Sequence, residues 1–513
     1  MTQLPPTGGK ALAEIIAERR RKAEQLRQAG TPLWGVDFTP SMSCAEAYRR
    51  APTVPEQDGE SVSVAGRIMR LRSSGGIAFA DCSDESGTLQ LMASRDDPGG
   101  NLVDELEQVD LGDVVGAEGT LTRTRRGEPS LRVTRITLLA KALRPPVGKY
   151  RGFVDVEQSY RRRYLDLLSD PSKREIFRQR SEVVRALRRV LDERGFLEVE
   201  TPVLQAIPGG GQARPFRTHH HSLDTDLYLR IALELYLKRL LVGGFERVYE
   251  LGRTFRNEGL SPRHNPEFTL LEAYQAYGDL AAMKELCQEL VVAAVAAAPR
   301  EGGLESEQGA ISLEPPFPSR SMADLVHQLT GLDLDGLWGE PDRMVEEAGR
   351  LNVEVAAEAA SGTVLYAIYE QLVEPNLSGP LFVTDYPVEV SPLARLSADP
   401  RFAERFELVV AGRELANAFS ELNDPLDQRR RLEEQARLRA AGDFDAQPFD
   451  EDFVEALEHG MPPAGGIGMG VDRLVMLVTG AKSIRDVVLF PTLRPQGSGD
   501  TDRPSAAAAP PSA

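Results

Sequence analysis

Apolar and polar residues alternate in short runs between Val62 and Leu143, a period of two that is typical of half-buried β-strands. Gly, Asp, Ser and Pro separate the runs, and these residues favour turns. Five runs show the alternation: 61–71, 77–84, 88–94, 113–121 and 130–139. Five short strands in so compact a segment predict a small barrel of the OB-fold type. A sandwich or a purely structural barrel fits this pattern equally well.

A helical period appears before this segment, over residues 10–29. Its apolar positions share one face: Leu12, Ile15, Ile16, Ala23 and Leu26. The basic residues 19–22 fall largely on the opposite face, and Gly30 with Pro32 ends the helix. The basic side has two interpretations, a solvated surface or a contact with a nucleic-acid backbone.

The pattern changes again after the proline-containing linker 141–150. Residues 181–196 carry apolar side chains at helical spacing, and we expect Gly195 to cap that helix. Helical stretches then alternate with strand-like runs up to about residue 492, without an internal repeat or a βαβ rhythm. The sequence therefore predicts a large α+β domain.

Four parts follow from these patterns. We expect a helical N-terminal extension over 1–57, a barrel over 58–145, the α+β domain over 146–494 and a tail over 495–513. The tail is rich in Gly, Ser, Ala and Pro and lacks the apolar side chains that offset the entropy of ordering. We therefore expect it to be disordered.

Composition supports a multidomain globular protein, because a chain of 513 residues, 41% of them hydrophobic, is too long to form a single ordinary hydrophobic core. The net charge of −18 argues against nucleic-acid binding over the whole surface, since phosphate contacts require Lys and Arg. The segment 61–150, however, holds as many basic as acidic residues. A nucleic acid can therefore be received on local strips, for which Phe79 and the arginines 67, 70 and 72 are candidates.

Targeting signals and metal clusters are not evident. No apolar run approaches the ~18–20 residues that a membrane span needs, and the first residues do not resemble a secretory signal, so we expect a cytoplasmic protein. Cys44, Cys82 and Cys287 form no CxxC pair, which argues against a zinc site and a disulfide framework. The adjacent histidines 219–221 are poor metal candidates, because neighbouring side chains rarely point at one ion.

Three windows of the large domain concentrate charged and aromatic residues. In the first, 253–274, strand-like runs flank a turn, so Arg256 and Glu258 can reach into a cleft with His264 and Phe268 beside them. An arginine fork suits an α-phosphate or a carboxylate, and an aromatic ring suits a purine face.

The second window spans 405–425. Glu407 and Glu414 lie seven residues apart, while Asn417, Phe419 and Glu421 alternate on one side of an expected extended strand. Two convergent carboxylates suit a magnesium ion on a triphosphate. A buried Glu421 beside an aromatic ring suits an alkylammonium group, because an unpaired ammonium in a closed pocket is costly. A set of surface acids is the competing interpretation.

The third window, 462–480, is a glycine-rich run that leads into an apolar helix with Arg473 in its first turn. Such glycines allow a phosphate to approach the backbone near a helix N-terminus. The spacing matches neither a P-loop nor a dinucleotide fingerprint. Close packing of the helix explains the glycines about as well.

In this order the windows resemble the three motifs of class II aminoacyl-tRNA synthetases. The similarity extends through RYLDLL, GFLEVETPVL, the IPGGGQARPF loop, SPRHNPEFTLLE, GRELANAFSELNDP and GGIGMGVDRLVML. These segments are most similar to the bacterial-type lysine enzymes of the subgroup that also serves aspartate and asparagine.

The resemblance implies an antiparallel sheet flanked by helices for catalysis and an N-terminal OB-fold that reads an anticodon. It also implies a homodimer formed partly through the segment ending at Pro202. ATP would activate L-lysine to lysyl-adenylate with release of pyrophosphate, and the lysyl group would pass to tRNA(Lys). No side chain has to act as a nucleophile, so catalysis would consist of positioning and charge neutralisation.

Residue roles follow from the same resemblance. ATP would contact Arg256, Glu258, His264, Phe268 and Arg473, with the two arginines also catalytic and Phe268 and Arg473 on either side of adenine. Mg²⁺ would be coordinated by Glu407 and Glu414. Lysine would be bound by Gly210, Glu234, Arg256, Glu272, Tyr274, Asn417, Phe419 and Glu421. Among these, Gly210 and Glu234 would receive the α-amino group and Tyr274 and Glu421 the ε-ammonium.

Three alternatives are weighed against this interpretation. An aspartate or asparagine enzyme would need a basic group where Glu272, Tyr274 and Glu421 suit a cation. A paralogue that lysylates a protein is disfavoured by the intact barrel region. A catalytically dead RNA-binding relative would have lost an ATP contact, and none is missing. The segment 72–84 is less basic than the resemblance suggests, which leaves the anticodon contacts open.

Overall fold

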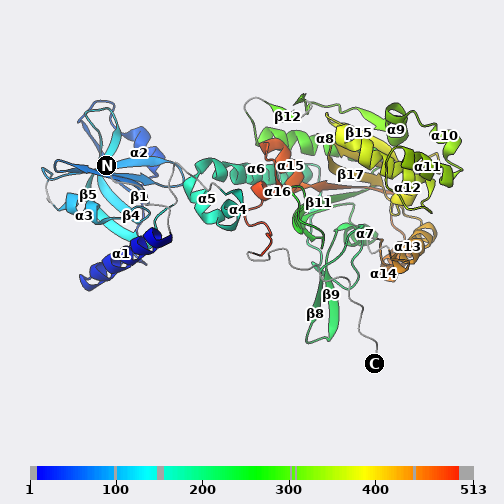
Figure 1. The fold of residues 1–513 in the computed structure, drawn as a ribbon, viewed down its shortest axis with the longest axis horizontal. Helices are drawn as coiled ribbons and strands as arrows, with labels where there is room; N and C mark the ends of the chain where they lie inside the picture. The colour runs from blue at the N-terminus through cyan, green and yellow to red at the C-terminus, as the bar shows by residue number, and fades with distance from the viewer. Residues whose placement is uncertain are drawn as a thin grey trace. The chain divides into compact units, whose positions relative to one another are not determined.

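The computed structural model describes residues 9–97, 101–146, 155–300, 303–306, 309–442 and 446–495. The end of the predicted linker, from 147, and the predicted tail, from 496, lie outside the described residues. The chain divides into two compact units, Met1–Pro171 and Ser172–Ala513 (Figure 1). No helix in the described ranges is long and apolar enough to cross a bilayer.

A closed barrel forms the centre of the first unit, with strand order β1-β2-β3-β5-β4. Its strands are β1 (Asp58–Ser74), β2 (Ile77–Ser83), β3 (Thr88–Ser94), β4 (Val114–Arg123) and β5 (Pro129–Ala140). Alternate residues of β1, such as Val64 and Ile68, are completely buried, as the period of two predicts. The expected five-stranded OB-fold barrel is confirmed, and the sandwich is excluded. The helices of this unit are α1 (Gly9–Gln28), α2 (Cys44–Arg50), α3 (Leu102–Gln108), α4 (Val156–Arg161) and α5 (Arg163–Ser169).

Helix α1 packs against the barrel through part of its basic side. Arg19 is buried and its Nη1 donates to the carbonyl of Ala142 at 3.0 Å. The ammonium of Lys22 lies 3.1 Å from Asp110 Oδ1. The expectation that residues 19–22 lie opposite the packing face is therefore wrong for Arg19 and Lys22. Their long side chains reach polar partners at the base of the barrel that the sequence pattern does not reveal.

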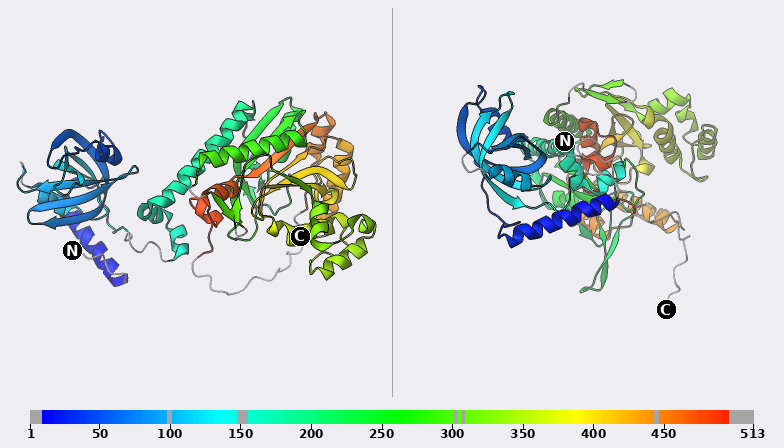
Figure 2. Two further views of the ribbon diagram at one scale, coloured as in Figure 1. Left: turned by 90° about the horizontal axis from the view of Figure 1, so that it is seen from above. Right: turned by 60° about the vertical axis from the view of Figure 1, so that its left-hand side comes forward.

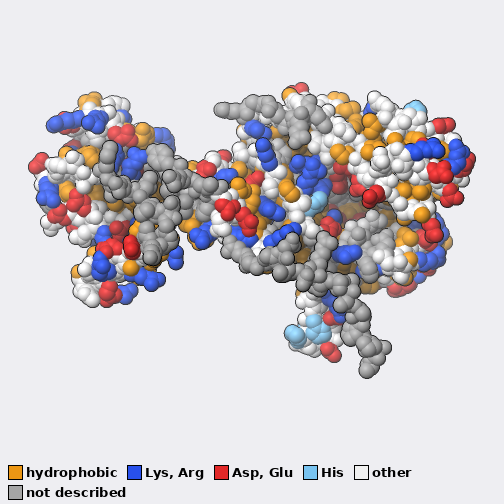
Figure 3. Space-filling model, viewed as in Figure 1, with side chains coloured by type: hydrophobic (Ala, Val, Ile, Leu, Met, Phe, Trp, Pro, Cys, Tyr) orange, Lys and Arg blue, Asp and Glu red, His pale blue; other side chains and the backbone are white. Residues whose placement is uncertain are grey.

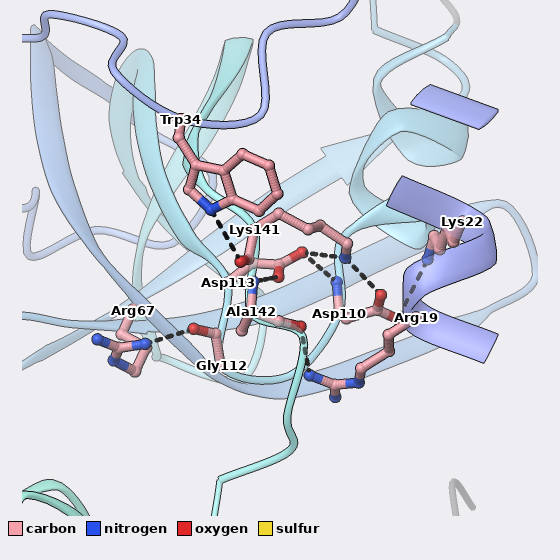
Figure 4. A network of polar contacts seen from close by, with 9 residues as sticks. All are labelled: Arg19, Lys22, Trp34, Arg67, Asp110, Gly112, Asp113, Lys141 and Ala142. Carbon is pink, nitrogen blue, oxygen red and sulfur yellow. Dashed lines mark hydrogen bonds and ion pairs between the residues drawn. The ribbon is translucent and has the colours of Figure 1, made fainter. Parts of the chain in front are cut away.

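A buried lysine ties this contact to the barrel. Lys141 follows β5, is fully buried, and places its Nζ 2.7 Å from Asp113 Oδ2 while also pairing with Asp110. Asp113 Oδ1 accepts the amide of Ala142 at 2.7 Å, and the indole of Trp34 donates to the carbonyl of Lys141 at 3.2 Å (Figure 4). Lys141 and Lys22 thus supply two cations to two carboxylates just before β4. Together with the hydrogen bond from Trp34, these contacts tie the segments that precede and follow the barrel to it.

The second unit is built on an eight-stranded sheet of order β14-β15-β16-β17-β18-β11-β10-β6. The pairs β6–β10 and β14–β15 at its two edges are parallel, and the other neighbours are antiparallel. The strands are β6 (Leu197–Glu198), β10 (Arg247–Phe255), β11 (Glu267–Ala276), β14 (Ser319–Ser321), β15 (Leu381–Pro387), β16 (Phe402–Val409), β17 (Glu414–Ser420) and β18 (Ala464–Gly470).

Helices pack against this sheet, and their contacts with it form separate apolar clusters. The largest cluster joins the sheet to α6 (Pro171–Glu193), α8 (Leu280–Ala297) and α15 (Val471–Thr479), the first two being the long helices in the left view of Figure 2. A second joins it to α7 (Glu234–Val242), α13 (Pro425–Ala440) and α14 (Glu451–Glu458). A third packs α9 (Met322–Thr330), α10 (Leu334–Leu337), α11 (Pro341–Arg350) and α12 (Ser361–Ile368) beside β15. The expected antiparallel sheet flanked by helices is confirmed.

Smaller elements complete the unit. They are β7 (Leu204–Gln205), β8 (Arg217–His220), β9 (Thr225–Leu229), β12 (Leu304–Ser306), β13 (Gly309–Ile311) and α16 (Ile484–Val487). The strands β7, β9 and β8 form a small sheet, and pale blue histidines gather at the end of the β8–β9 hairpin (Figure 3).

The window 405–425 contains two strands. Asn417 and Phe419 lie on β17, as expected of an extended strand, whereas Glu407 lies on β16, because Ala411 and Gly412 turn the chain with φ of 53° and 66°. The glycine-rich run before Arg473 forms strand β18. Helix α6 begins at Pro171, ten residues before the apolar periodicity that predicted it.

We expect Lys141→Met to destabilise the barrel by roughly 3–5 kcal/mol, because it leaves the buried carboxylate of Asp113 without its cation. Urea unfolding followed by Trp34 fluorescence measures this in a Trp338→Phe background, since the chain has two tryptophans. The control is Arg135→Met, which removes an exposed ion pair with Glu118 and should cost less than about 1 kcal/mol. Equal losses in the two variants would contradict the role of Lys141.

Candidate active site

One cavity gathers all but two of the predicted site residues. It lies against β11, β17, β18 and the start of α15. Its lining includes Gly210, Glu234, Arg256, Glu258, His264, Phe268, Glu272, Tyr274, Glu414, Asn417, Phe419 and Arg473. Glu407 and Glu421 do not line it. The three windows of the sequence therefore meet at one place, although more than 200 residues separate their ends.

Strand register forms the floor of this cavity. Gly466 of β18 lies between Tyr274 of β11 and Phe419 of β17, and the next row aligns Gly468 with Glu272 and Asn417. Successive residues of a strand alternate between faces, so residues two apart share one face. A Cβ on Gly466 would collide with the Tyr274 ring and with Glu421 Oε1. Gly466 thus makes room for the side chains of Tyr274 and Glu421, whereas the position of Gly468 stays open beside Glu272.

Acidic side chains collect at one end of the cavity. Glu272 is buried, and its two oxygens accept the Leu233 amide at 3.0 Å and the Tyr274 hydroxyl at 2.9 Å. Burial, with the nearby charge of Glu234, raises the pKa of Glu272 to about 7. Glu234 itself stands in the first turn of α7. This end of the cavity favours a cation.

Glu421 lies just beyond β17, with Oε1 in the space that a Cβ of Gly466 would occupy, and is 1% exposed. Its Oε2 pairs with Lys238 of α7, whereas Oε1 has no hydrogen-bond partner among the described residues. Burial raises the pKa of Glu421, and the Lys238 ammonium opposes that shift. A buried carboxylate oxygen without a partner is costly, so this atom is available to a ligand that brings a donor.

Basic and aromatic side chains occupy the rest of the cavity. The guanidinium of Arg256 lies 5.2 Å from the centre of the Phe268 ring. Arg473, in the first turn of α15, donates to the side chain of Glu414 at 3.0 Å. Burial and the charge of Arg473 lower the pKa of His264, which keeps that imidazole neutral at neutral pH. These groups suit a phosphorylated aromatic ligand.

Glu407 and Glu414 stand on the neighbouring strands β16 and β17 and line an adjoining hollow together with His264 and Arg473. Burial, then the charge of Glu414, raises the pKa of Glu407 to about 7. The charge of Glu414 thus disfavours ionisation of Glu407, and a cation bound between the two carboxylates would relieve this repulsion. No group of three or more potential metal ligands occurs in the described residues, so the protein alone does not supply a full coordination shell.

Sequence reasoning missed two functional neighbours. Arg405 of β16 donates to Glu407 at 2.6 Å and to Asn417 Oδ1 at 3.0 Å, which leaves the amide nitrogen of Asn417 for an acceptor in the cavity. Lys238 contacts Glu234 and Glu421. The available signal for Lys238 was a basic residue one helical turn after an acidic one within an apolar helix.

Two family models match the chain. The model for tRNA synthetases class II (D, K and N) matches residues 155–494, and the model for the OB-fold nucleic acid binding domain matches residues 62–139. The chain belongs to the class II tRNA synthetases of the D, K and N group. This confirms the family that the motifs suggested.

Curated members of this synthetase group match over nearly their full length. A lysine–tRNA ligase of Moorella thermoacetica is 48% identical, with 94% of this chain and 98% of the relative covered. One from Gloeobacter violaceus is 52% identical over 85% of this chain and 89% of the relative. One from Syntrophomonas wolfei is 47% identical, with 95% of this chain and 98% of the relative covered.

The acidic end of the synthetase cavity should make lysine use depend on pH. Because the pKa of Glu272 is raised to about 7, this carboxyl is protonated below that pH and attracts an ammonium less strongly. We expect kcat/KM for lysine, at saturating ATP and Mg²⁺, to fall as pH decreases through about 7 and to level off above it. Glu272→Gln should lower kcat/KM and flatten this limb. If kcat/KM for lysine still falls in the same way below pH 7 in that variant, another group is responsible for the fall.

Proposed function

We propose that this chain is a lysine–tRNA ligase, which forms lysyl-adenylate and pyrophosphate from L-lysine and ATP and then transfers the lysyl group to tRNA(Lys). The observation that carries the proposal is a cavity lined at one end by the buried carboxylates of Glu234 and Glu272, with the buried carboxylate of Glu421 next to it, and lined further on by two arginines. A substrate with two ammonium groups suits the first end, and a nucleotide phosphate suits the second. Curated relatives with this activity support it.

Lysine would lie along the glycine floor. Glu234 and the backbone of Gly210 receive its α-amino group, while Arg256 and Asn417 bind its carboxylate. Glu272 supplies further negative charge. Its methylenes pack on Phe419, and Tyr274 and Glu421 hold the ε-ammonium, for which Glu421 Oε1 is free of other partners in the described chain. Each polar group of the amino acid thereby meets a group of opposite character.

ATP would occupy the arginine side. Phe268 and Arg473 sandwich the adenine, Glu258 and His264 contact the nucleotide, and Arg256 holds the α-phosphate. The support for this arrangement is that all five side chains line one cavity. The neutral imidazole of His264 avoids adding charge beside the purine.

The reaction needs no protein nucleophile. A carboxylate oxygen of lysine attacks the α-phosphorus in line, the bond to the β-phosphate oxygen breaks, and pyrophosphate leaves. A ribose hydroxyl of the tRNA then attacks the activated carbonyl carbon, and AMP leaves. Arg256 and Arg473 act as catalytic residues by holding the phosphate and neutralising the charge that develops on it.

Magnesium is part of the proposal. Glu407 and Glu414 would hold Mg²⁺, and phosphate oxygens would complete the coordination shell that two carboxylates cannot fill. The ion supplies charge neutralisation to the triphosphate when bound. Arg405 orients Glu407 for this role through its 2.6 Å hydrogen bond.

The barrel is proposed to bind the anticodon, and we assign residues 58–145 to it, 1–57 to the N-terminal extension, 146–494 to the catalytic domain and 495–513 to a disordered tail. On the barrel, Arg72 lies 5.8 Å from the centre of the Phe79 ring, a pair suited to base stacking. Arg67 donates instead to the carbonyl of Gly112 at 2.6 Å (Figure 4). The ligase would act in the cytoplasm, which cell fractionation with immunodetection tests.

A homodimer is proposed through the segment around Pro202. Exposed apolar side chains lie along it: Leu197, Val203, Leu204 and Ile207. We expect Leu204→Asp to raise the dimer dissociation constant by at least about 30-fold, equivalent to about 2 kcal/mol. Sedimentation equilibrium measures this, with Leu426→Asp, the same substitution at a more exposed leucine on α13, as the control. A monomeric parent protein, or equal effects, would contradict the assignment.

The activity is tested by ATP–pyrophosphate exchange with each of the twenty amino acids, with and without added Mg²⁺. We expect exchange with lysine that depends on Mg²⁺. Glu421→Gln should raise the KM for lysine roughly 10- to 100-fold, the effect of losing a hydrogen bond to a charged group, and leave the KM for ATP nearly unchanged.

The matched control for that variant is Glu433→Gln, at an exposed position of α13. Exchange with a different amino acid would refute the lysine pocket. An unchanged KM for lysine in Glu421→Gln would refute the assignment of that carboxylate. A folded, ATP-binding protein without any exchange would favour an RNA-binding subunit.

A further inference from the structure

Lys238 is a buried cation that the proposed reaction does not use. It lies on α7 one turn after Glu234, and its side chain is completely buried. Its Nζ is 2.6 Å from Glu234 Oε1 and makes an ion pair with Glu421 Oε2. It is also 5.3 Å from the centre of the Phe419 ring. Phe419 lines the cavity, whereas Lys238 does not.

Packing does not explain a cation here. The neighbouring core positions of α7 are Leu235, Leu237 and Leu241, and an aliphatic side chain would serve equally at 238. Burying an ammonium costs several kcal/mol unless carboxylates compensate for it. Burial lowers the pKa of Lys238, but Glu234 and Glu421 outweigh this and raise it above its ordinary value. The side chain is therefore charged and held between two acids.

Charge counting gives it a role. Three buried carboxylates lie at the acidic end of the site: Glu234 and Glu272 line the cavity, and Glu421 lies next to it. When all three are ionised, as two bound ammonium groups favour, Lys238 brings their sum to two negative charges, which equals the two ammonium groups of lysine. Without Lys238 one carboxylate would remain uncompensated and would take up a proton instead. The internal ammonium therefore matches the charge of the pocket to that of a diamino acid.

Geometry gives it a second role. Lys238 contacts both the carboxylate assigned to the α-amino group, Glu234, and the one assigned to the ε-ammonium, Glu421. A single ammonium that binds both fixes the distance between them. It also engages only Oε2 of Glu421, so that Oε1 is left for the substrate. Two carboxylates at a fixed separation select the length of the chain that joins two ammonium groups.

We propose that Lys238 is a positioning residue that sets the spacing of Glu234 and Glu421 and thereby selects lysine over shorter diamino acids. The inference rests on the proposed assignment of these two carboxylates to the two ends of lysine. Lys238 touches neither substrate, and it acts through both glutamates. Ornithine, which is shorter by one methylene, is the diagnostic competitor.

The test is ATP–pyrophosphate exchange by the full-length Lys238→Met enzyme with lysine and with ornithine. Met preserves the length of the side chain and removes its charge. We expect the KM for lysine to rise roughly 10- to 100-fold and the preference for lysine over ornithine in kcat/KM to fall at least about 10-fold, while the KM for ATP stays within about 3-fold.

Arg239→Met is the matched control, because it removes a cation from the adjacent position of α7 whose partners, Asp450 and Asp452, lie outside the cavity. Its lysine preference should equal that of the parent enzyme. If Lys238→Met folds and keeps the lysine KM and the lysine preference of this control, the positioning role is wrong. A strong effect of Glu421→Gln in the same assay would show that the lysine pocket itself survives that failure.

The double variant Lys238→Met/Glu421→Gln covers the case in which the single variant does not fold, because it removes one charge of each sign. Because only the route through Glu234 remains in the Glu421→Gln background, we expect Lys238→Met to raise the lysine KM by less than about 10-fold there, against roughly 10- to 100-fold in the parent enzyme. Full additivity would overturn the proposed route through Glu421.

Discussion

The catalytic unit depends on one constraint, that charge removed from water must be compensated nearby. Its cavity buries carboxylates from α7, β11 and the end of β17, and the apolar clusters around them exclude water. A single internal ammonium, that of Lys238, compensates part of this charge. The remaining negative charge is left for the substrate to compensate, so the empty site is less stable and binding is stronger. The same rule is satisfied without a ligand in the barrel, where Lys141 and Lys22 together supply two cations to Asp110 and Asp113.

The sheet fixes the positions of these charged side chains and so gives the site its shape. Rows of residues in register across β11, β18 and β17 place a glycine between two functional side chains, twice in succession. Because strand pairing fixes these rows, the side chains do not rely on flexible loops for their positions. The glycines weaken β18 as an isolated strand, but both of its neighbours pair with it and its remaining residues lie in the core.

Much of this architecture could be predicted from the sequence, for physical reasons. A period of two predicts the barrel strands, and an apolar face predicts α1, because one side of each element is buried. The sequence motifs identified most of the residues that line the cavity, because the chemistry of these side chains is specific. The hairpin at Ala411 and Gly412 was missed, since an apolar run without a strong turn signal reads as one strand. Strand β18 was missed because glycines in sequence look like a loop, and only pairing on both sides makes them a strand.

Long-range ion pairs were the hardest features to predict. Lys238 and Glu421 are far apart in the chain, as are Lys22 and Asp110, and no local period links such partners. The row structure of the cavity floor has a consequence for how specificity can change over time. The contacts proposed for the end of the amino acid side chain come from one row, Tyr274, Gly466 and Phe419, and from the glutamate behind it, whereas the arginines proposed for the nucleotide stand elsewhere. A lineage could therefore exchange one amino acid for another by altering a single layer of residues while inheriting its nucleotide chemistry intact.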